Sequence, residues 1–171
     1  NGSAISIFAD PATGLRPVVS PPATSTAAFV IANASVNIQG LSIVVSQNIP
    51  YGVFASSSYV TLSSVSVSTS GSLGIYTAGV RISSRSAVSY STVTVWNAHG
   101  LWLDGSTMTV VSYSTAVSKN AGFYALFLQG SDGNTVLRSY IANLGGHGAG
   151  LESSADSNTI SQSTMVSNGL G

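Results

Sequence analysis

The sequence predicts an all-β fold in which short strands stack as about six coils of a solenoid. One strand pattern recurs along the chain, and successive copies begin 21 to 27 residues apart. No window inside these repeats places apolar residues at the i, i+3, i+4 and i+7 positions of an amphipathic helix. Because a unit this small cannot bury its own apolar face, it must stack on the next unit. The copies begin at Ala28, Gly52, Gly79, Gly100, Ala125 and Gly150.

The clearest copy is the segment from Gly100 to Gly105. Its residues alternate, so that Leu101 and Leu103 point to one face of a strand and Trp102 and Asp104 to the other. The segment ends in Asp-Gly, which is a strong turn signal. Each coil is therefore predicted to contain a short strand with one buried face and one outward face.

A second strand follows the first in every coil, and it carries an apolar or aromatic pair five residues apart. We expect the first members of these pairs to stack in one inward column. Units of about 24 residues are too short for a propeller blade of roughly 40, and the leucine-rich repeat signature is absent. This leaves one coil of a parallel β-helix as the repeating unit. The pairs are Val36 and Leu41, Val60 and Val65, Val88 and Val93, Met108 and Tyr113, Val136 and Ile141, and Ile160 and Met165.

Two turn segments carry a family resemblance. Residues 131–136 are Ser-Asp-Gly-Asn-Thr-Val, and residues 155–160 are Ala-Asp-Ser-Asn-Thr-Ile. With their flanking Gly-Leu-type strands, they resemble the right-handed β-helix repeats of the pectin-lyase-like superfamily, over about residues 27–171. The resemblance implies a right-handed parallel β-helix. It leaves the function open, because that superfamily includes polysaccharide lyases, glycoside hydrolases, epimerases, phage tailspikes, adhesins and proteins without catalysis.

The two ends of the chain suggest how it is organised. Residues 1–26 contain one strand-like stretch and then Pro11, Pro17 and Pro21, which mark a loop or an edge wrap. We expect this segment to form a partial coil with a Pro-rich cap, and residues 27–171 to form the β-helix. The last residues stop at the end of a coil without a capping element. An open end exposes strand edges, so we expect either a piece of a longer protein or a subunit that stacks on another.

Composition excludes several classes of function. Five basic and five acidic side chains cancel, so the chain lacks the positive charge that nucleic acid or an anionic membrane would attract. The absence of cysteine removes disulfides and thiolate metal sites, and no apolar run approaches the 18 residues of a membrane span. We expect no cofactor, no nucleic-acid partner and no membrane span. The Ser-, Thr-, Gly- and Ala-rich surface favours a secreted protein, extracellular or at the cell surface.

One outward strip differs from the Ser and Thr that cover the other faces. Aromatic faces stack on the C–H faces of sugar rings, while carboxylate, amide and guanidinium groups bond sugar hydroxyls. The strip therefore predicts a site for a polysaccharide or cell-surface glycan. Alternatively, the aromatic residues cover the sheet or pack beneath a neighbouring subunit. The first column of the strip is Phe54, Arg81, Trp102, Phe127 and Glu152. The second column, two residues further along each strand, is Ser56, Ser83, Asp104, Gln129 and Ser154, where Ser154 requires a shift of one residue.

Catalytic candidates on this strip are few. Asp104 and Glu152 lie two coils apart, roughly 10 Å by strand spacing, near the upper end of the separation of about 6.5–9.5 Å in inverting glycosidases. Arg81 is the candidate base for a lyase, with Arg85 as a second candidate near the strip. The paired Asp-Asp signature of the pectin-hydrolysing members is missing, and no acids cluster as calcium ligands. His99 and His147 each precede a glycine, and we interpret them as turn residues rather than as a metal pair.

Three functional hypotheses follow. The preferred one is an extracellular β-helix that binds polysaccharide or serves in adhesion, as in a tailspike-like surface protein. The second is a structural subunit that assembles through open ends or lateral faces into a filament or a homo-oligomer. The third is a polysaccharide lyase or glycoside hydrolase, which the thin set of catalytic candidates makes the least favoured.

Overall fold

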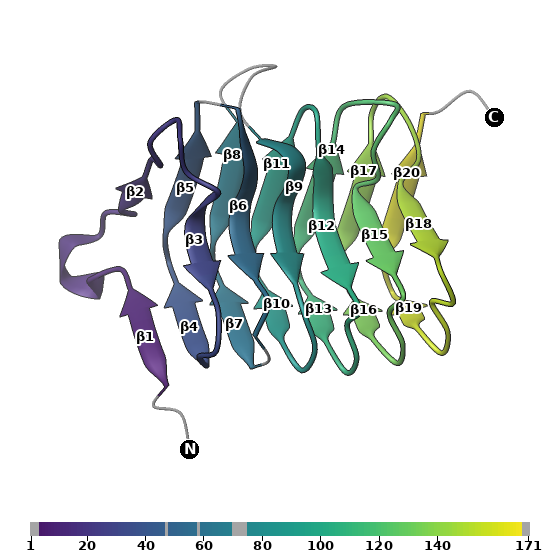
Figure 1. Ribbon diagram of the computed structural model, residues 1–171, viewed down its shortest axis with the longest axis horizontal. Coiled ribbons are helices and arrows are strands. Elements are labelled where there is room, and N and C mark those ends of the chain that lie inside the picture. The colour runs from purple at the N-terminus through teal and green to yellow at the C-terminus, as the bar shows by residue number, and fades with distance from the viewer. Residues whose placement is uncertain (1–3, 47, 58, 70–74, 169–171) are drawn as a thin grey trace.

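The computed structural model describes residues 4–46, 48–57, 59–69 and 75–168, and these form a parallel β-helix (Figure 1). Three sheets run along the solenoid, two with seven strands and one with six, and each strand pairs in parallel with the strands one coil before and after it. The predicted all-β solenoid of about six coils is confirmed. Within the described residues the helical structure is a single 3₁₀ turn, η1 (Pro11–Thr13).

The strands follow one another around each coil in the order sheet A, sheet B, sheet C. Sheet A contains β1 (Ile5–Phe8), β4 (Val36–Gln39), β7 (Val60–Ser63), β10 (Ala87–Ser89), β13 (Val110–Ser112), β16 (Thr135–Leu137) and β19 (Thr159–Ser161). Sheet B contains β2 (Val18–Val19), β5 (Ser42–Val45), β8 (Ser66–Thr69), β11 (Thr92–Val95), β14 (Thr115–Ser118), β17 (Tyr140–Asn143) and β20 (Thr164–Ser167). Sheet C contains β3 (Ala27–Ile31), β6 (Ile49–Ala55), β9 (Ile75–Ile82), β12 (His99–Asp104), β15 (Leu126–Gln129) and β18 (Ala149–Glu152).

The core consists of inward columns of aliphatic side chains, as period-2 alternation requires. The predicted column of sheet A is partly correct. Val88, Val136 and Ile160 do belong to one register line. Val36 and Val60 are buried and paired with each other, but they lie two residues ahead of that line. The line itself runs through Ile7, Ile38, Leu62, Val88, Val111, Val136 and Ile160.

The prediction that Met108 points inward is wrong. Met108 is 66% exposed and has a left-handed backbone (φ 57°) in the turn before β13. Val111 takes the core position instead, in register with Val88. The neighbouring Thr109 is fully buried, and its hydroxyl accepts a hydrogen bond from the Ser86 backbone N–H at 3.2 Å. This buried polar contact fixes the turn and leaves Met108 outside.

Polar side chains form ladders at two corners of the later coils. Between sheets C and A, each backbone N–H donates to a side-chain oxygen one coil further on: Ser86 to Thr109 at 3.2 Å, Thr109 to Asn134 at 2.9 Å and Asn134 to Asn158 at 3.0 Å. These ladders supply partners for backbone groups that the turns would otherwise leave unpaired. The corner between sheets A and B carries an equivalent serine ladder, made of Ser91, Ser114, Ser139 and Ser163.

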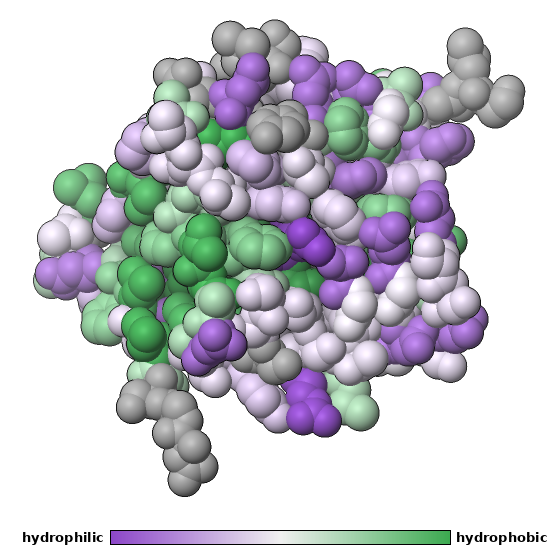
Figure 2. Space-filling model, viewed as in Figure 1, coloured by the Kyte–Doolittle hydropathy of each residue, from purple (hydrophilic) through white to green (hydrophobic). Residues whose placement is uncertain are grey.

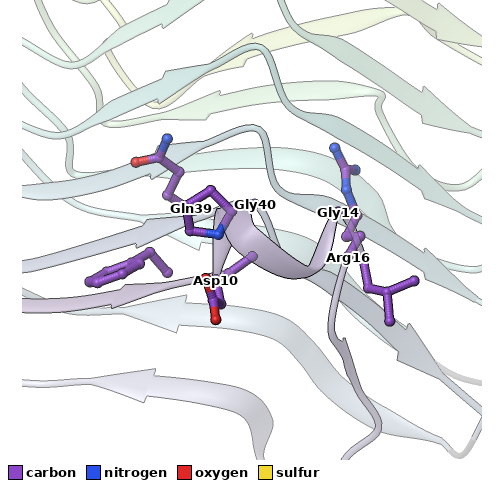
Figure 3. Close-up of a pocket in the computed structure, with 9 residues that line it drawn as sticks. Asp10, Gly14, Arg16, Gln39 and Gly40 are labelled. Carbon is purple, nitrogen blue, oxygen red and sulfur yellow. The ribbon is translucent and has the colours of Figure 1, made fainter.

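The N-terminal segment begins two of the sheets, because β1 pairs with β4 and β2 pairs with β5. Between them, the Asp10 carboxylate caps η1 by accepting the Ala12 N–H at 2.9 Å. A pocket of about 510 Å³ lies beside this turn (Figure 3). Its polar side chains Asp10, Arg16 and Gln39 point in different directions in that view, so they do not converge on one ligand position.

Candidate functional site on the outer face of sheet C

Four of the predicted glycan-binding residues lie side by side on the outer face of sheet C, in front in Figure 1. Phe54 is in register with Arg81, Arg81 with Trp102, and Trp102 with Phe127. Adjacent strands of a sheet are about 4.8 Å apart, so these side chains form a continuous row. We call these four residues the aromatic row. The residues before them, Val53, Val80, Leu101 and Leu126, are buried in the core.

A polar row runs beside the aromatic row, two residues further along each strand. Asp104 is in register with Gln129, and Gln129 with Glu152. We call these three residues the polar row. The sequence places Glu152 directly after Phe127 in the aromatic row, and this placement is wrong because Phe127 is in register with Gly150.

Gly150 takes the place that follows Phe127 in the aromatic row, and it has no side chain to continue that row. The ring of Tyr124 lies over this glycine, and a Cβ at position 150 would approach the ring to 2.7 Å. A side chain there would displace the ring, so the aromatic row ends at Phe127 and the next outward side chain on β18 is Glu152. The Tyr124 hydroxyl donates to Glu152 Oε1 at 2.8 Å. This hydrogen bond raises the pKa of Tyr124, which therefore stays a donor.

Arg81 lies among aromatic rings and is held by two oxygen partners. Its Nε donates to Asp104 Oδ2 at 3.0 Å, its Nη2 donates to the same oxygen, and its Nη1 donates to the Tyr51 hydroxyl at 3.1 Å. The guanidinium carbon is 4.6 Å from the Trp102 ring centroid and 5.2 Å from that of Phe54, within cation–π range. Burial acts to lower the pKa of Arg81, but the hydrogen bonds to Asp104 and Tyr51 leave that pKa above its ordinary value. Arg81 therefore cannot accept a proton as a lyase base would.

His99 is enclosed by rings rather than free to act as a base. Its imidazole stacks on Phe127 with centroids 4.6 Å apart and on Tyr124 at 5.6 Å, and Phe123 meets it edge-on at 5.2 Å. Its Nδ1 accepts the Tyr124 backbone N–H at 3.0 Å. Burial lowers the pKa of His99 to about 4, so the imidazole is neutral near pH 7.

A second aromatic column supports the aromatic row, and sequence reasoning missed it. Each of its members lies three residues ahead of a member of the aromatic row, and each contacts that residue or Arg81. The sequence signal is an aromatic or imidazole ring repeated three positions before each ring of the row. The prediction that His99 is a turn residue is wrong, because His99 is the first residue of β12. The members are Tyr51, His99 and Tyr124.

The exposure of these residues decides what the face can do. Phe127 is only 6% exposed, because the rings around it cover it. Phe54, Arg81 and Trp102 are half-buried, and Glu152 is exposed. The face is thus an open, amphipathic surface with ring edges and faces on one side and hydrogen-bond acceptors on the other. Rings and hydrogen-bonding side chains thus lie side by side on one solvent-accessible face.

Neither a metal cluster nor a membrane span is found in the described residues. No three His, Cys, Asp or Glu side chains there lie close enough to hold one metal ion. His99 and His147 both contact the ring of Tyr124, at 5.6 and 5.9 Å between centroids, so the tyrosine is a shared neighbour of the two imidazoles. Over the same residues, no helix is long and apolar enough to cross a bilayer.

Comparison with known proteins gives one family. The model of a family described as "Periplasmic copper-binding protein (NosD)" matches residues 17–171, which is most of the chain. No curated protein and no solved structure matches the chain.

Proposed function

Since this chain belongs to the NosD family, we propose that it is a periplasmic β-helix that binds polysaccharide along the outer face of sheet C. The proteins of this family are described as periplasmic, which agrees with the predicted location outside the cytoplasm. The observation that carries the proposal is the pairing of two rows on one face. The aromatic row offers Phe54 and Trp102 to the C–H faces of sugars, and the polar row offers Asp104, Gln129 and Glu152 to their hydroxyls.

Several features support a binding surface rather than a catalytic one. Asp104 is occupied by Arg81, and Glu152 by the Tyr124 hydroxyl. The two carboxylates lie on strands separated by β15, about 10 Å apart by strand spacing. Arg81 is fully charged and bonded on three nitrogens. The resemblance to the pectin-lyase-like superfamily adds a precedent for holding polysaccharide along a β-helix, without requiring cleavage.

The copper in the family description does not fit the residues of this chain. Copper in proteins is bound by imidazole, thiolate and thioether ligands that converge on one point. The sequence has no cysteine. His99 is enclosed by rings with its Nδ1 engaged, and Met108 and Met165 lie far apart along the chain, in the turn before β13 and on β20 of sheet B. With no cluster of three His, Cys, Asp or Glu side chains among the described residues, we do not assign copper binding to this chain.

The test is retention on immobilised polysaccharides, with the two tryptophans as a matched pair. Trp102→Ala should weaken retention at least tenfold, or about 1.4 kcal/mol, because it removes the largest ring at the centre of the aromatic row. Trp96→Ala should leave retention unchanged, since Trp96 lies outside sheet C, in the turn after β11, where Lys119 Nζ is 4.9 Å from its ring. Equal retention of both variants would refute the proposal.

Light scattering on the same samples addresses the alternative of a subunit contact. If Trp102→Ala converts assembled particles into single chains while retention persists, the aromatic row is an interface between subunits. The structural-subunit hypothesis then replaces glycan binding.

A further inference from the structure

We propose that the surface on sheet C selects uncharged polysaccharides and disfavours polyuronates. This inference rests on the proposed function and adds the chemical class of the glycan. It follows from where the charges lie. A polyuronate carries one carboxylate on each sugar, so a site that binds it needs cations able to meet those carboxylates.

Sheet C offers one cation, and that cation is already satisfied. Of the five Lys and Arg residues in the sequence, only Arg81 lies on a strand of sheet C. Its Nε and Nη2 donate to Asp104, and its Nη1 donates to Tyr51. The faces of the guanidinium are covered by the rings of Trp102 and Phe54. Because the charge of Arg81 is paired with that of Asp104, a uronate meets an ion pair there and not a free cation.

The other four cations lie outside the strands of sheet C. Arg16 lines the pocket beside η1. Lys119 lies over the ring of Trp96 in the turn that follows sheet B. Arg85 lies in the turn between sheets C and A and donates to the Tyr59 hydroxyl, and Arg138 lies in the turn between sheets A and B and donates to the Tyr113 hydroxyl.

The remaining charge on the face is negative. Glu152 is exposed at the end of the polar row, and the one ion pair among the described residues is that of Arg81 with Asp104. The nearby His99 is neutral near pH 7 because burial lowers its pKa to about 4. A carboxylate-bearing chain laid along the face therefore meets an uncompensated carboxylate. An uncharged sugar meets acceptors for its hydroxyls at Asp104, Gln129 and Glu152.

The experiment compares oligosaccharides of equal length by calorimetry on the intact protein. The uncharged probes are glucose hexamers with β-1,4, β-1,3 and α-1,4 linkages, and the charged probe is hexagalacturonate, all at about 10 mM salt, where screening is weak. At least one glucose hexamer should bind ten or more times as tightly as hexagalacturonate. Adding salt to 1 M should narrow this ratio, since it screens repulsion of the uronate and has little effect on an uncharged ligand.

A pair of charge variants tests whether the preference for uncharged oligosaccharides comes from the charges on sheet C. Glu152→Gln should raise the ratio of hexagalacturonate affinity to glucan affinity at least threefold. Asp10→Asn makes the same change of net charge beside η1, at the opposite end of the solenoid from β18 (Figure 1), and should leave that ratio unchanged. If both variants shift the ratio equally, the overall charge of the protein is responsible and the inference is wrong.

The outcomes also separate this inference from the proposed function. Tighter binding of hexagalacturonate than of every glucose hexamer would overturn the charge inference and leave glycan binding in place. No binding of any of the four hexamers would overturn both.

Discussion

The early and late coils of the solenoid fill the same corner positions with different chemistry. At the corner between sheets C and A, the early coils carry Val36 and Val60, whereas the later coils carry Ser86, Thr109, Asn134 and Asn158. The aliphatic and the polar corner residues meet in adjacent coils, where the Val60 N–H donates to the Ser86 hydroxyl at 3.2 Å. On the visible face of the molecule, hydrophobic residues gather over the N-terminal coils (Figure 2).

A parallel β-helix can thus stabilise a corner in two ways. An aliphatic corner gains free energy from buried apolar area, and its side chains place no demand on hydrogen-bond partners. A polar ladder gives each buried N–H a partner, but each bond contributes only about 1 kcal/mol net, while an orphaned buried group costs about 1–3 kcal/mol. The later coils are therefore more dependent on the identity of each side chain. The same coils contribute most of the residues of the site on sheet C.

The largest expected effect comes from placing a charge in the aliphatic corner. Val60 is fully buried, so Val60→Asp should lower the free energy of unfolding by more than about 3 kcal/mol by burying an unpaired carboxylate. Chemical denaturation measures this. Ser66→Asp, on the partly exposed face of β8, is the control and should cost less than about 1 kcal/mol. Similar losses for the two variants would mean that the corner is not closed to water.

A slightly smaller effect should follow from making the ladder aliphatic. Asn134 is 1% exposed; its Oδ1 accepts the Thr109 N–H, and its Nδ2 donates to the Ser106 carbonyl at 2.9 Å and to Asn158 Oδ1 at 3.0 Å. Asn134→Leu leaves the buried Thr109 N–H without its acceptor and removes one donor each from the Ser106 carbonyl and Asn158 Oδ1, so it should cost about 2–3 kcal/mol in the same assay.

If Asn134→Leu does not change the free energy of unfolding, the polar corner does not depend on its hydrogen-bonding side chains. An unchanged free energy of unfolding would show that aliphatic and polar side chains are interchangeable at that corner, one residue at a time.

The smallest expected effect is a pH dependence from His99. Its pKa is about 4 in the folded chain against an ordinary value of 6.5, because burial disfavours the charged imidazole. The unfolded chain therefore binds the proton more readily, and folding stability should fall as the pH drops from 6.5 to 4 and then level off. Since His99 is only partly buried, we expect a loss of about 1–2 kcal/mol.

The measurement is the difference in unfolding free energy between the wild type and His99→Phe across this pH range. Phenylalanine keeps a ring in the stack and cannot titrate. A difference that stays constant from pH 7 to 4 would show that His99 is solvated in the folded state.

The sequence alone was sufficient for the fold class and for the aromatic row. Alternation of buried and outward residues is a local property of an extended backbone, so Leu101 and Trp102 could be assigned to opposite faces without knowing their neighbours. The repeat of 21 to 27 residues then placed Phe54, Arg81 and Trp102 on one face of adjacent coils. These assignments depend on chemistry within a few residues and on the need of each coil to stack on the next.

Only the tertiary structure decided the register at coils of unequal length and the pairing of charges. The structure places Glu152 in the polar row and Met108 outside the core, in contrast to the prediction. Backbone hydrogen bonds between coils and the buried ladder side chains determine these positions. The hydrogen bond between Arg81 and Asp104 joins residues 23 positions apart in the sequence. No local sequence pattern shows that the charge of Arg81 is paired with that of Asp104. Whether a cation is free to meet a ligand depends on which side chains the coils bring beside it, and that is set by packing between coils.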